Sequence, residues 1–147
     1  QPLHTSGRHT DLEKNGDQGG NLFHLTPQGT PRAEQVNLHW FWDSIAVRNM
    51  PILAGQCEDD YIAFVAGSIL NRFPFPTDGK GLNLGRYSDW QQESFRIATT
   101  EVFRSDLKRW ELPSDDYRRN AYNVSEQRLA MAGYRLGETL EQIFGKR

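Results

Sequence analysis

The sequence has little that would hold a metal through sulfur or cross a membrane. It contains a single cysteine, Cys57, among 147 residues, which excludes an internal disulfide and a cysteine-rich zinc knuckle. Its longest apolar runs fall far short of the roughly 20 residues that span a bilayer. The formal net charge is -2, so no basic field indicates a general nucleic-acid binder. Any metal must therefore be held by histidine and carboxylate, and any contact with nucleic acid must be local.

Aromatic and aliphatic residues are nevertheless numerous enough for one packed unit. Hydrophobic residues make up 37% of the chain, which suffices for a core at this length. Apolar residues at the helical period predict helices over residues 37–50, 58–72, 88–102 and 125–145. The short apolar run at 22–25 predicts a strand or hairpin near the N-terminus. We therefore expect an all-α fold with one short strand.

Residues at the helix ends refine this prediction. Asn37 is a favourable N-cap for the first helix. Ser88 and Gln91 form a capping box at the start of the third, and Gly145 suits the end of the last. The helix over 58–72 carries a broad apolar face, so we expect it to lie in the core.

His39 and Asp43 are the clearest candidates for a metal site. They lie four residues apart, so a helix places them on one face, one turn from each other. An imidazole and a carboxylate can hold zinc, which in catalytic sites has three protein ligands and one open position. On spacing alone a surface hydrogen-bonded pair is more common, but the aromatic residues between the two favour a partnered carboxylate. His4 is the best third ligand, because glycine-rich sequence around the predicted strand can fold the N-terminal segment back onto the helix.

Five blocks of sequence resemble a known family, the zinc-dependent single-strand nucleases typified by nuclease P-one and nuclease S-one. The blocks occur in the family's order and cover nearly the whole chain, which makes the resemblance more specific than any one motif. They are QPLH at 1–4, GDQGGN at 16–21, NLHWFWD at 37–43, WQQES at 90–94 and QRLAMAGYRL at 127–136.

This resemblance implies a mainly α-helical fold, shared with bacterial zinc phospholipase C, and three zinc ions in a cleft. It assigns His4, His39 and Asp43 to one of these ions. The family's other zinc ligands lie upstream, so we expect residues 1–147 to be the C-terminal portion of a single nuclease domain. The implied reaction is hydrolysis of single-stranded DNA and RNA to 5′-nucleotides, and we expect the isolated portion to be inactive.

The resemblance also implies a substrate contact and a location. Asn21 matches the family's Gly-Gly-Asn, in which the amide contacts a base edge, so single-stranded DNA or RNA is the expected partner. We expect a secreted or periplasmic monomer that needs its upstream part and makes no stable association with a membrane. The single Cys57, where plant and fungal relatives form disulfides, points to a bacterial member.

Other interpretations stay open from the sequence. Asn21 could be only a turn residue after two glycines, and Glu93 could support a buried polar group. His9 and His24 have no partner at metal spacing, so we expect both outside the site. A zinc phospholipase C would use the same ligands on lipid headgroups, and a chain without the upstream ligands could be a non-catalytic helical fragment. A 3′-nucleotidase activity is also compatible with the resemblance.

Overall fold

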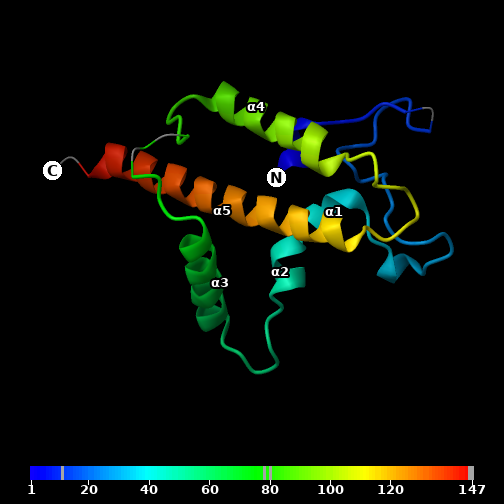
Figure 1. The fold of residues 1–147 in the computed structure, drawn as a ribbon, viewed down its shortest axis with the longest axis horizontal. Helices are drawn as coiled ribbons and strands as arrows, with labels where there is room; N and C mark the ends of the chain where they lie inside the picture. Colours follow the sequence, from blue (N-terminus) through cyan, green and yellow to red (C-terminus); the bar gives the residue numbers. More distant parts are fainter. Residues whose placement is uncertain (11, 78, 80, 146–147) are drawn as a thin grey trace.

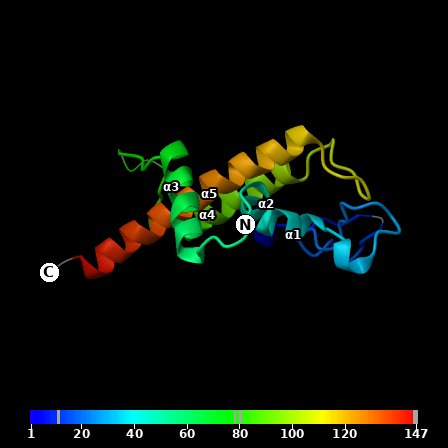
Figure 2. The same cartoon turned by 90° about the horizontal axis from the view of Figure 1, so that it is seen from below.

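The computed structural model describes residues 1–10, 12–77, 79 and 81–145, and its regular structure is helical (Figure 1). The longest helix, α5 (Asp115–Phe144), runs along the long axis of the molecule, with α4 (Tyr87–Ile97) antiparallel beside it. Helices α2 (Ile45–Asn49) and α3 (Glu58–Arg72) pack against the opposite side of α5. Figure 2 shows α3 crossing α5 steeply, whereas α4 lies along it. The predicted mainly helical fold class is confirmed.

None of the helices in the described ranges is both long and apolar enough to span a bilayer.

The core lies where the 3-10 helix η1 (Pro2–Thr5) and helix α1 (Leu38–Asp43) meet the first half of α5. A buried chain of hydrogen bonds fixes this junction. The indole Nε1 of Trp42 donates to the Tyr117 hydroxyl at 3.0 Å, and that hydroxyl donates to the Val102 carbonyl at 2.8 Å. Burial raises the pKa of Tyr117, so the hydroxyl stays a donor. The core residues are Leu3, Phe23, Leu25, Leu38, Phe41, Trp42, Ile45, Val102, Tyr117, Ala121 and Val124.

The first predicted helix is present but divided in two. Asn37 caps it as expected, with its side-chain oxygen accepting from the Trp40 amide at 2.8 Å. At Ser44 the amide and the hydroxyl both donate to the Trp40 carbonyl. Competition of this kind favours a helix end, so α1 ends at Asp43 and α2 begins at Ile45.

The last helix begins at Asp115, ten residues before the predicted start at 125, so that predicted start is wrong. Ser114 is the N-cap, and its hydroxyl accepts from the Tyr117 amide at 3.1 Å. Asp115 and Asp116 follow in the first turn, where negative charge complements the helix dipole. The polar residues that look like a loop in the sequence are therefore a cap. The helix ends with Gly145 at its C-cap, as predicted.

The predicted capping box at Ser88 is wrong, since α4 already begins at Tyr87 without a side-chain cap. Its C-terminal end continues into a π-helical turn, η3 (Ala98–Val102), in which the Phe103 amide donates to the Ala98 carbonyl at 3.0 Å. Ala98 and Val102 are buried there, at the end of the helical segment predicted over 88–102. Helix η1 packs against α4 and η3.

Two predictions about apolar residues are wrong. Helix α3 has the predicted bounds, but Ile69 is its one buried residue, and the Phe64 side chain is 63% exposed. Helix α3 packs chiefly against α5, and Ile62 and Leu70 on it are exposed as well. The predicted strand at 22–25 is reduced to an isolated bridge between His24 and Asn37, because Pro27 follows on one side and α1 begins on the other.

Glu93 joins α4 to α5, which confirms its predicted structural role. Its carboxylate accepts from Arg128 at 2.9 Å and from Arg135 at 2.8 Å. The buried Arg135 also donates to the Leu82 carbonyl at 2.8 Å. Burial by itself would raise the pKa of Glu93, but hydrogen bonds from Arg135 and Arg128 outweigh it and hold the pKa below its ordinary value.

We predict that Glu93→Gln lowers the free energy of unfolding by about 1.5 to 3 kcal/mol near neutral pH, because charge-assisted hydrogen bonds are lost. Because the pKa of Glu93 is lower in the folded protein than the value of 4.5 in the unfolded chain, ionised Glu93 stabilises the fold at pH values above 4.5. This stabilisation is lost as the pH falls through the folded-state pKa. The difference between wild type and variant should therefore shrink on acidification below about pH 4.5.

Urea unfolding at a series of pH values measures both quantities. Glu111→Gln is the matched control, because Glu111 is exposed and lies 3.9 Å from Lys108. If the difference in unfolding free energy between wild type and Glu93→Gln stays constant as the pH is lowered, ionisation of Glu93 does not hold α4 on α5.

Candidate metal centre

The structure brings together the three side chains that the sequence predicts as metal ligands. His4 lies in η1, whereas His39 and Asp43 lie one turn apart on α1. One nitrogen from each ring and one carboxylate oxygen all lie within 4.8 Å of one another, the one such group of three or more among the described residues. The His4 and His39 rings stack with centroids 5.1 Å apart.

The donor set suits zinc. Two imidazole nitrogens and one carboxylate oxygen are zinc's preferred ligands after thiolate, and the chain offers no cysteine here. Ligand atoms about 2.0 to 2.2 Å from a tetrahedral ion lie about 3.4 Å apart. The Nε2 atom of His39 and the Oδ2 atom of Asp43 are 3.4 Å apart. Because His4 and Asp43 are exposed, an ion held here would keep one side open to a water or a substrate.

The Gly19 carbonyl determines which nitrogen of His39 can bind a metal. It lies 2.9 Å from Nδ1 of His39. A carbonyl can only accept, so Nδ1 must carry the proton, and Nε2 is left with a free lone pair facing Asp43. Metal-binding histidines commonly have such an outer partner, which fixes the tautomer and the orientation of the ring.

Gly19 also permits the close approach of the two elements that carry the ligands. Its φ is +63°, a conformation that favours glycine. A Cβ at this position would lie 2.7 Å from the carbonyl oxygen of Leu3, the residue before His4. Any side chain here would therefore push η1 away from α1.

The loop between His4 and Gly19 is anchored at several points. Asp17 is completely buried, and its Oδ1 atom accepts from the Arg8 amide at 2.9 Å. Arg109 donates to the Glu13 carboxylate at 2.7 Å and to the Leu22 carbonyl at 2.6 Å. Position 11 of this loop lies outside the described residues. The first contact closes the loop on itself, and Arg109 joins the middle of the loop to the segment that follows it.

Other residues singled out from the sequence lie around the cluster rather than in it. Asn21 is exposed, and its amide donates to the Gln18 carbonyl at 2.9 Å. His24 stacks on Trp110 with centroids 4.6 Å apart, and His9 lies 3.0 Å from the Lys14 carbonyl. Neither histidine joins the metal cluster, as predicted.

A cavity beside Asp43 contains polar residues that the sequence did not suggest for the site. It measures about 280 Å³, and its lining includes Asp43 together with Ser125 and Arg128 of α5. Arg128 follows Asp43 by 85 positions in the chain, so no local spacing could indicate that the two border one cavity.

The chain matches the family model described as S1/P1 Nuclease over residues 1–145. No curated protein and no solved structure matches it.

We predict that Gly19→Ala lowers zinc affinity by about ten- to a hundredfold, the usual effect of losing an outer partner of a ligand histidine. The added methyl group would displace Leu3 and the carbonyl that orients His39. Gly29→Ala is a matched control, because φ there is +88° and nothing lies within 4 Å of the new Cβ. Competition titration with a zinc chelator measures the affinities. Equal losses in the two variants would mean that backbone strain, rather than the close approach at Gly19, lowers the affinity.

Proposed function

Because the chain belongs to the S1/P1 nuclease family, we propose that it acts in a zinc-dependent phosphodiesterase that hydrolyses single-stranded DNA and RNA to 5′-nucleotides. The observation that supports this most strongly is the cluster of His4, His39 and Asp43. The family match also favours a nuclease over the zinc phospholipase C that the ligand set alone allows. A 3′-nucleotidase activity is compatible with the same site and is part of the proposal.

His4, His39 and Asp43 would hold zinc through two nitrogens and one oxygen. A zinc ion bound there supplies a Lewis acid for a phosphate oxygen. His39 contributes its Nε2 lone pair because Gly19 holds the proton on Nδ1. Asp43 contributes negative charge, which offsets part of the charge of the cation and lies 3.4 Å from His39.

Asn21 is our candidate for contact with a base. It follows Gly19 and Gly20, whose backbone borders His39, so the amide is close in sequence to the group that orients a ligand. An amide can donate and accept at once, which suits several bases. An unpaired base reaches such a group directly, whereas a base in a duplex must first be unstacked, which favours single strands.

We further propose that residues 1–147 are the C-terminal portion of the catalytic domain and work as a secreted or periplasmic monomer, without stable membrane association. One group of three ligands holds one ion, and the described residues offer no second group of this size. The remaining ligands of a three-zinc centre would then come from residues upstream of Gln1.

This proposal predicts one bound zinc and only trace hydrolysis of single-stranded DNA by residues 1–147. A longer chain that supplies the upstream ligands should restore turnover, and His39→Ala in that chain should lose one zinc and nearly all activity. Metal analysis and release of acid-soluble nucleotides measure these effects. Rapid turnover by residues 1–147 alone would show that the site is complete without upstream ligands.

Asn21→Ala in the active longer chain should raise the KM for dinucleotides several-fold and leave the zinc content unchanged. The loss of one neutral hydrogen bond costs about 0.5 to 1.5 kcal/mol of binding, and removal of ground-state binding changes KM. Steady-state kinetics on dinucleotides with each base test this. Unchanged kinetics on every base would mean that Asn21 serves only the turn that it makes with Gln18.

A further inference from the structure

The Gly19 carbonyl that orients His39 lies in a turn with an uncommon backbone conformation. Gln18, Gly19 and Gly20 follow one another with φ values of +54°, +63° and +86°. Residues other than glycine rarely adopt a positive φ, and a run of left-handed residues is unfavourable for L-amino acids. Contacts with residues outside the turn must therefore help to hold it in this shape.

Asp17, the residue before the turn, makes such contacts on both sides. Its backbone amide donates to the Arg8 carbonyl at 2.8 Å, and its Oδ1 atom accepts from the Arg8 amide at 2.9 Å. Its carbonyl accepts from the Leu22 amide, which follows the turn, at 3.1 Å. Asp17 therefore connects the segment that leaves η1 to the two ends of the turn.

The Asp17 side chain is completely buried, although one of its oxygens is unpaired. None of the described residues donates a hydrogen bond to its Oδ2 atom. Burial of an unpaired polar atom costs free energy, so stability alone does not favour an aspartate at this position. Departures of this kind from local rules are expected next to functional sites. The Oδ1 atom therefore provides the interaction that the side chain contributes.

The turn that Asp17 holds faces the start of α1. The Gly19 carbonyl lies 2.9 Å from Nδ1 of His39, and the Gly20 carbonyl accepts from the His39 amide at 3.4 Å. A Cβ added at Gly20 would lie 3.2 Å from the Cβ atom of Leu38, so the turn packs closely against α1. A shift at Asp17 would therefore move both carbonyls relative to His39.

We propose that Asp17 is a positioning residue for the metal centre. It does not belong to the group of candidate ligands. Through Arg8, its Oδ1 atom fixes the turn that presents the Gly19 carbonyl to Nδ1 of His39. The proton is thereby held on Nδ1, and Nε2 stays available to zinc. This inference rests on the zinc site of the proposed function and adds a residue that acts on a ligand through the backbone.

The tautomer of His39 in the zinc-free protein tests the inference without relying on metal or activity. Nitrogen–proton correlation NMR spectra at alkaline pH should show the proton of wild-type His39 on Nδ1. In Asp17→Ala the Gly19 carbonyl loses its fixed position, so a large share of His39 should carry the proton on Nε2 instead. Asp17→Asn keeps an oxygen for the Arg8 amide and should restore the wild-type tautomer.

Competition with a zinc chelator gives the second readout. Asp17→Ala should lower zinc affinity about tenfold, the lower end of the loss expected when a ligand histidine loses its outer partner. Asp17→Asn should stay within about threefold of the wild type, because its oxygen still accepts. If Asp17→Ala does not fold, Asp17→Leu fills the same place without an acceptor and carries the same two predictions.

Asp89→Ala is the matched control. It removes the same side chain from the first turn of α4, where Asp89 pairs with Arg86 at 2.7 Å. The variant should leave the His39 tautomer unchanged and zinc affinity within about twofold of the wild type. Urea unfolding of every variant shows whether the loss of zinc affinity simply follows the loss of stability.

The inference is overturned if Asp17→Ala and Asp17→Leu keep the wild-type tautomer and zinc affinity. It is also overturned if Asp17→Asn or Asp89→Ala loses as much as Asp17→Ala. A wild type that binds no zinc would overturn the proposed function. A tautomer that still responds to Asp17→Ala would then support the action of Asp17 on His39, and an unresponsive one would overturn that as well.

Discussion

The contact between the Gly19 carbonyl and Nδ1 of His39, 2.9 Å long, is the interaction on which the candidate site depends. It sets the tautomer of His39, and it exists only because a glycine with positive φ lets the loop pass between η1 and α1. The same passage brings His4 against His39. One backbone position therefore sets the tautomer of one candidate ligand and the placement of another.

Contacts between the helices hold α1 next to the loop that carries Gly19. The buried Trp42–Tyr117–Val102 hydrogen bonds join α1, α5 and η3, and the Glu93 ion pairs join α4 to α5. Helix η1 packs against α4 and η3, so the position of His4 depends on both connections. Unpaired groups in such a network would be costly, which favours a single arrangement of the two ligand-bearing elements.

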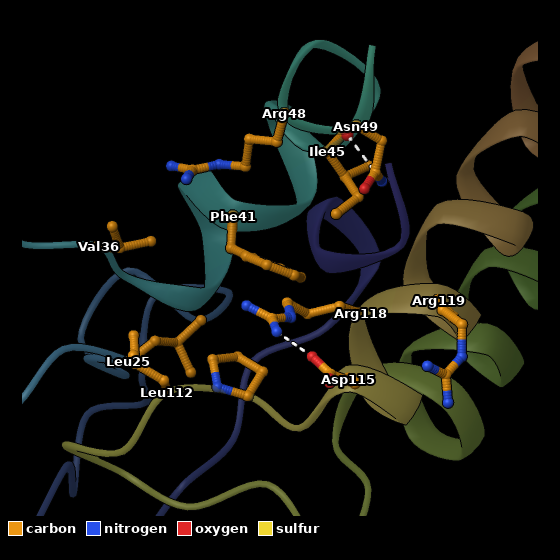
Figure 3. Close-up of a pocket in the computed structure, with 11 residues that line it drawn as sticks. Leu25, Val36, Phe41, Ile45, Arg48, Asn49, Leu112, Asp115, Arg118 and Arg119 are labelled. Carbon is orange, nitrogen blue, oxygen red and sulfur yellow. Dashed lines mark hydrogen bonds and ion pairs between the residues drawn. The ribbon is translucent and has the colours of Figure 1, made fainter. Parts of the chain in front are cut away.

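Because an α-helix has 3.6 residues per turn, neighbouring residues of α1 lie on different faces. One face carries His39 and Asp43 for a metal, the opposite face contributes Phe41 to an arginine-lined cavity, and Trp40 lies between them. Three arginines, Arg48, Arg118 and Arg119, line that cavity (Figure 3), within a chain whose formal net charge is -2.

The sequence by itself determined what depends on near neighbours along the chain. The 3.6-residue period predicted the bounds of α3 and the shared face of His39 and Asp43, and Asn37 marked the start of α1. The N-cap at Ser114 was not predicted, because the polar residues around it resemble a loop. The exposure of Phe64, the Gly19–His39 contact and the shared cavity of Arg48 and Arg118 were decided only by the tertiary structure. They join residues 20 or more positions apart or depend on which surfaces meet, and no local pattern specifies the path of the loops between them.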